Sequence, residues 1–120
     1  MLLKALRAKI HRATITEADL DYIGSITIDA DLMDAVGILE GEFVLVADLA
    51  DGARFETYVV AGPRGSGTVC VNGAAARLVH VLDRVIIMAH AYVTPEEMKK
   101  LKPSIVLVDD KNRVVKKLSM

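Results

Sequence analysis

Short stretches of alternating or continuously apolar residues, rich in β-branched side chains, recur along the chain and predict β-strands. They cover residues 10–16, 25–28, 42–49, 54–61, 68–71, 85–92, 104–109 and 113–118. Turn-forming pairs such as Asp51-Gly52 and Asn72-Gly73 separate several of them. Many short strands joined by such turns indicate a mainly β domain, with a small barrel as the expected architecture.

Two short helices interrupt this strand pattern. Asp29 can cap a helix over residues 30–36, and Gly37 is the expected C-terminal stop. Thr94 followed by Pro-Glu-Glu predicts the start of a second helix, which we expect to end near Leu101. Residues 2–10 fit both element types, because their leucines could share one helix face while residues 10–16 alternate as in a strand.

Composition places the chain among single-domain proteins with an aliphatic core. It has 120 residues, of which 52% are hydrophobic and only 4% aromatic, and one domain over residues 1–120 is expected. A net charge of −1 gives no electrostatic reason to expect nucleic acid or an anionic membrane as a partner. The apolar run around 85–88 is far too short to span a bilayer. The single cysteine, Cys70, fits a reducing compartment, and we expect a cytoplasmic protein.

Three short motifs could carry chemistry. The 62–67 loop, GPRGSG, lacks the lysine and hydroxyl order of a nucleotide-binding loop, which argues against phosphate binding. Cys70 and His80 could suggest a thiol nucleophile, but a lone cysteine in an apolar strand is typical of the core. Gly24-Ser25 by itself predicts a turn, yet a serine hydroxyl can attack the preceding carbonyl where the backbone bends, and glycine permits such a bend.

The surroundings of Gly24-Ser25 change its interpretation. In order along the chain stand KIHRATI (9–15), DYIGS (21–25), TIDADLM (27–33), ARFETY (53–58), RGSG (64–67) and NGAAA (72–76). In this order and spacing the chain resembles the aspartate 1-decarboxylase family, self-processing pyruvoyl enzymes that form β-alanine. The resemblance covers about residues 1–110. It departs at Val81-Leu82-Asp83, where family members often have a Pro-Gly-Asp turn.

The resemblance implies a fold, a cofactor and an assembly. The fold would be a six-stranded double-psi β-barrel with short helices, in which residues 2–16 form one long strand. Cleavage between Gly24 and Ser25 would give fragments 1–24 and 25–120 and convert Ser25 into a covalently bound pyruvoyl group. That ketone would form a Schiff base with L-aspartate, so that neither pyridoxal phosphate nor a metal is expected. A homotetramer with sites between subunits is implied, and an activating protein for cleavage is possible.

The resemblance also assigns roles to individual residues. Tyr58 matches the proton donor, for which a weakly acidic phenol is suited. Arg54 and Lys9 match the cations that bind the substrate carboxylates, and an Arg guanidinium binds a carboxylate with two parallel hydrogen bonds. His11 is expected near the site without a role in turnover. Tyr22 is expected beside the cleaved bond.

The remaining matched residues combine processing and substrate contact. Thr57 matches a residue used in both, although it is adjacent to Tyr58 and a flat strand would point the two side chains to opposite faces. A bent strand, or a site shared between subunits, would resolve this conflict. The segment Asn72, Gly73, Ala74 and Ala75 could direct backbone N–H groups at an oxyanion or a carboxylate.

Two other functions remain open from the sequence. One is a small barrel that binds a ligand or a partner and is never cleaved. The other is a pyruvoyl decarboxylase for a different amino acid. Chain cleavage separates the first from an aspartate decarboxylase, and substrate assays separate the second.

Overall fold

Residues 1–119 of the computed structural model are described, and they contain nine strands, two α-helices and one 3₁₀-helix. The strands are β1 (Leu3–Thr14), β2 (Glu17–Asp19), β3 (Ser25–Asp29), β4 (Phe43–Asp48), β5 (Arg54–Gly62), β6 (Val69–Asn72), β7 (Arg84–Val93), β8 (Ser104–Val108) and β9 (Val114–Ser119). The helices are α1 (Ala30–Val36), the 3₁₀-helix η1 (Gly73–Leu78) and α2 (Pro95–Lys100). The mainly β prediction is confirmed. The expected count of six strands is only approximate, because the described residues contain nine. The short β2 is an element that the sequence pattern did not predict.

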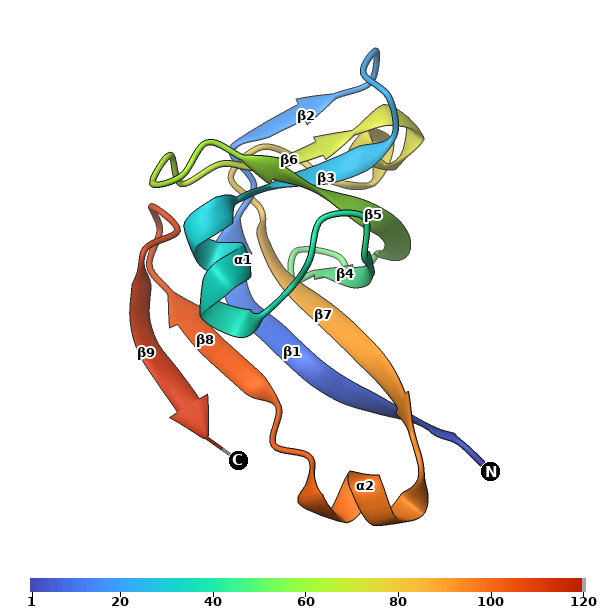
Figure 1. The fold of residues 1–120 in the computed structure, drawn as a ribbon. Helices are drawn as coiled ribbons and strands as arrows, with labels where there is room; N and C mark the ends of the chain where they lie inside the picture. The colour runs from blue at the N-terminus through green and yellow to red at the C-terminus, as the bar shows by residue number, and fades with distance from the viewer. Residues whose placement is uncertain (120) are drawn as a thin grey trace.

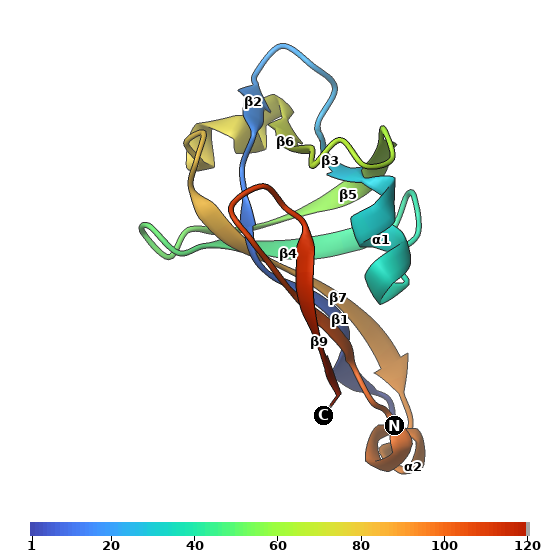
Figure 2. The ribbon, with the colours of Figure 1, turned by 90° about the vertical axis from the view of Figure 1, so that its left-hand side faces the viewer.

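All strands belong to one sheet in the order β2-β6-β3-β5-β4-β7-β1-β8-β9. The strand β5 links its two halves, because it pairs in parallel with β3 and antiparallel with β4. Two further pairs, β1 with β8 and β2 with β6, are also parallel. Figure 1 shows β2, β3 and β6 at one end of the molecule, whereas the long β1 and β7 run together toward α2 at the other end. Figure 2 shows the same long arm from the side.

The barrel interior is aliphatic, as composition predicted. Alternate residues of the strands point into it, so that one sheet face is buried and the other, here called the outer face, carries the polar and partly exposed side chains. No aromatic side chain is among the largest fully buried ones in the described residues, which are Ile10, Ile15, Ile26, Ile28, Leu32, Ile87, Val44, Val46, Val59, Val69, Val71 and Val85.

Both predicted helices are confirmed together with their end signals. The Asp29 carboxylate accepts from the Asp31 backbone N–H at 2.8 Å, and Gly37 ends α1 in the left-handed conformation at φ 76°. Thr94 and Glu97 form a reciprocal capping box at the start of α2. Residues 3–10 are strand and not helix, because β1 is paired with β7 on one side and with β8 on the other.

The C-terminal hairpin is fastened to the barrel by one side chain. Asn112 is 1% exposed and lies in the β8–β9 turn. Its amide accepts from the Thr14 N–H at 2.7 Å and donates to the Thr14 and Gly67 carbonyls at 2.9 and 2.8 Å. Among the described residues, no helix has the length and apolar character required to cross a bilayer.

Candidate functional site

Ser25 begins β3 and is buried, with 1% of its surface exposed. Its hydroxyl donates to the Ile23 carbonyl at 3.2 Å, so the Ser25 side chain is turned toward the backbone of the preceding residues. The same oxygen accepts from the Asn72 side-chain amide at 3.0 Å. Ser25 and Asn72 face each other because β3 and β6 are antiparallel and these two residues are paired. The expected site serine therefore has an ordered hydroxyl.

Asn72 is the centre of a small polar network. Its amide nitrogen also donates to the Thr27 hydroxyl at 3.1 Å, and its carbonyl oxygen accepts from the Cys70 thiol at 3.1 Å. Asn72 occupies the N-cap position of η1, yet its side chain makes no capping hydrogen bond there. Its polar atoms are instead committed to Ser25, Thr27 and Cys70, which all lie on the outer face of β3 and β6.

Gly73 approaches the backbone that precedes Ser25. A Cβ atom at Gly73 would lie 2.6 Å from the Gly24 Cα and 2.9 Å from the Gly24 nitrogen, and its φ is +74°. A Cβ atom at Gly24 would meet no heavy atom within 4 Å, and its φ is not in the left-handed range. Sequence reasoning placed the need for glycine at Gly24, whereas the close approach places it at Gly73.

Tyr58 lies on the strand next to Ser25. The parallel pairing of β3 with β5 sets Ile26 opposite Val59, and both are fully buried. Ser25 and Tyr58 each precede this pair by one residue, so both point to the outer face. Thr57 points the other way and is 8% exposed. Within one chain, Thr57 and Tyr58 therefore point to opposite faces of the sheet, as expected for adjacent residues of a strand.

The candidate cations lie on the outer face, but away from Ser25. His11, Ile86, Ala47 and Arg54 form one row across β1, β7, β4 and β5. Lys9 precedes His11 by two residues and shares its face. Three strand spacings separate His11 from Arg54, which is about 14 Å. Arg54 and Tyr58 are four residues apart on β5, which is about 13 Å.

The protonation of His11 follows from this position. Its pKa is lowered by burial and then by the charges of Lys9, Arg12 and Arg84. The imidazole is therefore neutral at pH 7.

The pocket beside Ser25 has acidic walls. It has a volume of about 230 Å³ and is lined by Glu17, Asp19, Tyr22, Thr27, Thr68, Cys70 and Asn72. None of these described lining residues is a cation. Burial, followed by the charges of Glu17 and Asp19, raises the pKa of the Cys70 thiol to about 11. A substrate with two carboxylates would be repelled by this pocket as one chain builds it.

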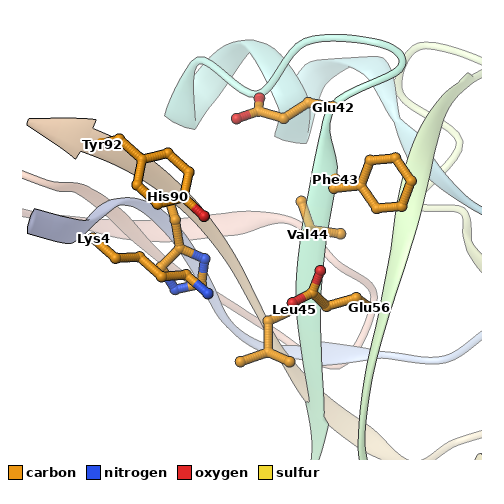
Figure 3. Close-up of a pocket in the computed structure, with 8 residues that line it drawn as sticks. All are labelled: Lys4, Glu42, Phe43, Val44, Leu45, Glu56, His90 and Tyr92. Atoms are coloured by element: carbon orange, nitrogen blue, oxygen red, sulfur yellow. The ribbon is translucent and has the colours of Figure 1, made fainter. Parts of the chain in front are cut away.

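A second pocket lies on the outer face between β4 and β7. It has a volume of about 260 Å³ and is lined by Lys4, Glu42, Phe43, Val44, Leu45, Glu56, His90 and Tyr92. Figure 3 shows Lys4, His90 and Tyr92 on one side, facing β4 with Phe43 and Glu56 on the other. The Phe43 ring packs at 6.1 Å from the Tyr58 ring, which connects this pocket to the candidate proton donor.

The structure thus brings together only part of the predicted site. Gly24, Ser25, Asn72 and Gly73 are in direct contact or hydrogen bonded, and Tyr22 lines the adjoining pocket. Ala74 and Ala75 follow within η1. Lys9, Arg54 and the inward-facing Thr57 are not part of that cluster in one chain. In the described residues, no group of three or more His, Cys, Asp or Glu side chains could hold a metal ion.

Comparison with known proteins identifies the family. The aspartate decarboxylase family matches residues 1–115. The chain belongs to this family. It is 62% identical to aspartate 1-decarboxylase of Caldicellulosiruptor saccharolyticus over 97% of this chain and 91% of the relative. It is 61% identical to the enzyme of Lactiplantibacillus plantarum over 98% of this chain and 91% of the relative. It is 58% identical to the enzyme of Bacillus cereus over 94% of this chain and 89% of the relative.

A solved structure supports the barrel type for this aspartate decarboxylase family member. A rationally designed double-psi β-barrel protein matches 66% of this chain and 92% of its own, with a TM-score of 0.50 and 18% identity. The predicted double-psi β-barrel is confirmed.

Sequence reasoning missed two members of the Asn72 network. Thr27 was assigned no role, and Cys70 was interpreted as a core residue. The alternation of β3 and β6 was the available signal, because Ser25 and Thr27 are two residues apart on one strand and Cys70 and Asn72 are two apart on the other, so each pair shares a strand face. His80 lies in an exposed turn after η1, where its backbone N–H donates to the Asp83 carboxylate at 3.0 Å.

Proposed function

We propose that this protein is an aspartate 1-decarboxylase, which converts L-aspartate into β-alanine and CO2 and supplies β-alanine for pantothenate and coenzyme A. Family membership and identities of 58–62% with enzymes of that name support the assignment. The observation that carries it is the buried Ser25 hydroxyl, held by Asn72 beside the Gly24–Gly73 contact. We further propose that it acts in the cytoplasm.

The first proposed event is self-cleavage at Gly24-Ser25. The Ser25 hydroxyl attacks the Gly24 carbonyl, and the C–N bond breaks as an ester forms. Loss of the Ser25 α-proton then expels the Gly24 carboxylate and leaves a dehydroalanine at residue 25. Addition of water and loss of ammonia give the pyruvoyl ketone. The products are a 24-residue and a 96-residue fragment.

The residues around Ser25 fit this step. Asn72 holds the hydroxyl oxygen, and Gly73 admits the Gly24 backbone at a distance that a side chain would prevent. Burial of Ser25 protects the ester from unproductive hydrolysis by bulk water. We assign Tyr22 and Thr57 to processing as well.

When bound at residue 25, a pyruvoyl group supplies a ketone beside an amide that accepts the electron pair left by CO2. Arg54 and Lys9 bind and orient the two substrate carboxylates. Tyr58, on the same sheet face as Ser25, holds the proton that replaces CO2. Asn72, Gly73, Ala74 and Ala75, with Thr57, complete the substrate contacts.

We propose that these groups meet between subunits of a homotetramer. The pocket beside Ser25 has two acids, whereas Arg54 and Lys9 lie elsewhere on the outer face. A second chain that presents its outer face would bring cations to that pocket. The aromatic side chains of Phe43 and Tyr92, which are 63% and 70% exposed, are then available for subunit contact.

Denaturing gels with intact-mass measurement test the proposal. We expect two fragments from the purified wild type and a single chain from Ser25→Ala. Phenylhydrazine should label the fragment that begins at residue 25, and CO2 should be released from aspartate in preference to glutamate. Arg54→Ala should cleave normally yet turn over aspartate at least tenfold more slowly, the loss expected when one charged hydrogen-bonding partner is removed.

An intact, unlabelled wild-type chain after prolonged warm incubation would overturn self-cleavage as a property of the chain alone. Repeating the incubation with cell extract tests whether an activating protein is required. Continued absence of cleavage would favour a binding barrel, and normal cleavage with CO2 released from another amino acid would change the substrate.

A further inference from the structure

Cys70 is a member of the Asn72 network to which the proposed chemistry assigns no role. It lies on β6 opposite Thr27 of β3 and Glu17 of β2, and it is 6% exposed. Its thiol donates to the Asn72 carbonyl oxygen at 3.1 Å. The opposite end of the same amide donates to Ser25 at 3.0 Å.

The two ends of an asparagine side chain are nearly the same in shape and opposite in hydrogen bonding. If the Asn72 amide were rotated by half a turn, its oxygen would face Ser25 and Thr27, and both hydroxyls would donate to it. The Ser25 hydroxyl would then give up its hydrogen bond to Ile23, and its oxygen would lose the donor it now has. Which end of Asn72 faces Ser25 therefore decides how the Ser25 hydroxyl is oriented.

We propose that Cys70 is a positioning residue for self-cleavage, whose thiol fixes the Asn72 amide so that its nitrogen faces the Ser25 hydroxyl. This inference rests on the proposed cleavage at Gly24-Ser25.

The surroundings of Cys70 suit a donor and not a nucleophile. Burial and the nearby carboxylates of Glu17 and Asp19 keep the thiol protonated at neutral pH. A protonated thiol has one hydrogen to donate, and Asn72 receives it. A thiolate would instead repel the amide oxygen and favour the rotated amide. The same two carboxylates therefore support the orientation that Ser25 needs.

The test compares one substitution that keeps a hydrogen-bond donor at residue 70 with one that removes it. Cys70→Ser keeps a donor on β6 in a slightly smaller side chain, whereas Cys70→Val has no donor and is one carbon atom larger than cysteine. Freshly purified precursor is incubated, and the first-order rate of conversion into the two fragments is followed by intact mass. Thermal unfolding and circular dichroism check that each variant is folded.

We expect Cys70→Ser to cleave within about twofold of the wild type, and Cys70→Val to cleave roughly 2- to 10-fold more slowly, the range that one hydrogen bond of ordinary net strength allows. Equal slowing by both substitutions, or no slowing by Cys70→Val, would overturn the positioning role. If Cys70→Val does not fold, Cys70→Ala replaces it with the same expectation.

Infrared spectroscopy gives a second readout that does not require cleavage. Cys70 is the only cysteine, so the S–H stretching band belongs to it alone. In the uncleavable Ser25→Ala chain we expect a band at the position of a hydrogen-bonded thiol, which moves to higher frequency in Ser25→Ala/Asn72→Val. A band that does not move would overturn the Cys70–Asn72 hydrogen bond. Wild-type chain that never cleaves would defeat the proposed function and the positioning role, yet this band would still report the contact.

Discussion

Single residues at two turns, Gly73 and Leu82, have a positive φ angle for different reasons. Gly73 is required by space as well as by conformation, because its neighbour is the Gly24 backbone. At Leu82, by contrast, a bulky side chain occupies a left-handed backbone conformation that glycine adopts more readily. These positions allow the two effects to be separated by substitution.

Gly73→Ala should slow or abolish cleavage at Gly24-Ser25, because the new methyl group would lie 2.6 Å from the Gly24 Cα. Gly52→Ala is the matched control: its φ is +76°, close to that of Gly73, but nothing lies within 4 Å of the added atom. We expect Gly52→Ala to lower the free energy of unfolding by about 1–2 kcal/mol without changing the cleavage rate. Intact mass and chemical denaturation measure both. Equal cleavage rates in the two variants would show that the close approach is not needed.

Leu82→Gly should stabilise the protein by roughly 1 kcal/mol. Leu82 has φ 78° and lies at the third position of the turn 80–83, in which the Asp83 N–H donates to the His80 carbonyl at 3.0 Å. Its side chain is 75% exposed, so little packing is lost. Urea denaturation of Leu82→Gly and Leu82→Ala tests this, because alanine keeps the unfavourable φ. A stability gain in Leu82→Ala as large as in Leu82→Gly would contradict the backbone explanation.

At the scale of elements, loops and hairpins are fastened to the barrel by buried polar side chains. Asn112 fixes the β8–β9 hairpin to β1 and to the 62–67 loop. Asp48 and Asp83 lie beside each other where the β4–β5 hairpin meets the start of β7. Such groups are costly when their partners are lost, because the barrel offers no water in exchange.

Asn112→Ala should lower the free energy of unfolding by about 2–4 kcal/mol, because it leaves buried Thr14 and Gly67 backbone groups without partners. Lys111→Ala, in the same turn but exposed, should change stability by less than about 0.5 kcal/mol. Both values come from urea denaturation of the Ser25→Ala chain, which keeps the precursor uniform. Similar losses in the two variants would mean that any substitution in the β8–β9 turn destabilises the protein, and that the Asn112 hydrogen bonds make no special contribution.

The Asp48 carboxyl should make stability fall as the pH rises. Burial, then its hydrogen bond to Asp83, raises the pKa of Asp48 from 3.8 to about 6, and the same hydrogen bond lowers the pKa of Asp83. Between these two pH values the folded protein holds a proton on Asp48 that the unfolded chain releases. Its contribution is therefore fully present below pH 3.8 and is lost as the pH rises through about 6.

The measurement is the free energy of unfolding at several pH values between 4 and 7. Each unit of pKa difference corresponds to about 1.4 kcal/mol. Asp48→Asn should remove this pH dependence, because the amide carries no ionisable proton. Asp51→Asn, an exposed change in the same hairpin, should keep most of it. The lowered pKa values of His11 and His90 act in the opposite direction in this window, so the decisive quantity is the difference between the wild-type and Asp48→Asn profiles. Equal slopes in the two would show that Asp48 does not hold its proton.

At the scale of the whole molecule, the residues of the proposed site form two separate groups within one chain. Ser25, Asn72 and Gly73 lie at the end of the barrel formed by β3 and β6, whereas Lys9 and Arg54 lie on the outer face of the other half of the sheet. A dianionic substrate needs both halves.

Two impaired variants should therefore complement each other. Ser25→Ala chains keep the cations but cannot form the cofactor, and Arg54→Ala chains have the reverse defect. Chains co-expressed with different tags and purified as mixed oligomers should release CO2 from aspartate, while each variant alone is far less active. Sedimentation measures the size of the assembly. Mixed oligomers with no more activity than Arg54→Ala alone would show that the two residues act within one chain.

Local patterns predicted most of the fold. The two helices were found from Asp29 and Thr94 caps, because a cap involves residues only two or three positions apart. Residues 3–10 were ambiguous until their partners β7 and β8 were known, since leucines and lysines suit either element locally. The strand β2 was missed because three residues are too few to show alternation, and only its pairing with β6 defines it.

The candidate site was found by motif order, but its geometry was not. The motifs selected Ser25, Asn72 and Gly73 as site residues, but they did not show which residues contact these three in the fold. Alternation along each strand could place Thr27 beside Ser25 and Cys70 beside Asn72, but only the pairing of β3 with β6 brings the four side chains together.

The sequence by itself determined the element types, the turns, the aliphatic core and the family, because these depend on neighbours along the chain or on the order of short motifs. Tertiary structure decided that Gly73, and not Gly24, must lack a side chain. It also decided that Asn72 holds Ser25 and that the cations lie away from it. Those facts depend on which strands are paired, and strand pairing joins residues whose separation along the chain leaves no local pattern.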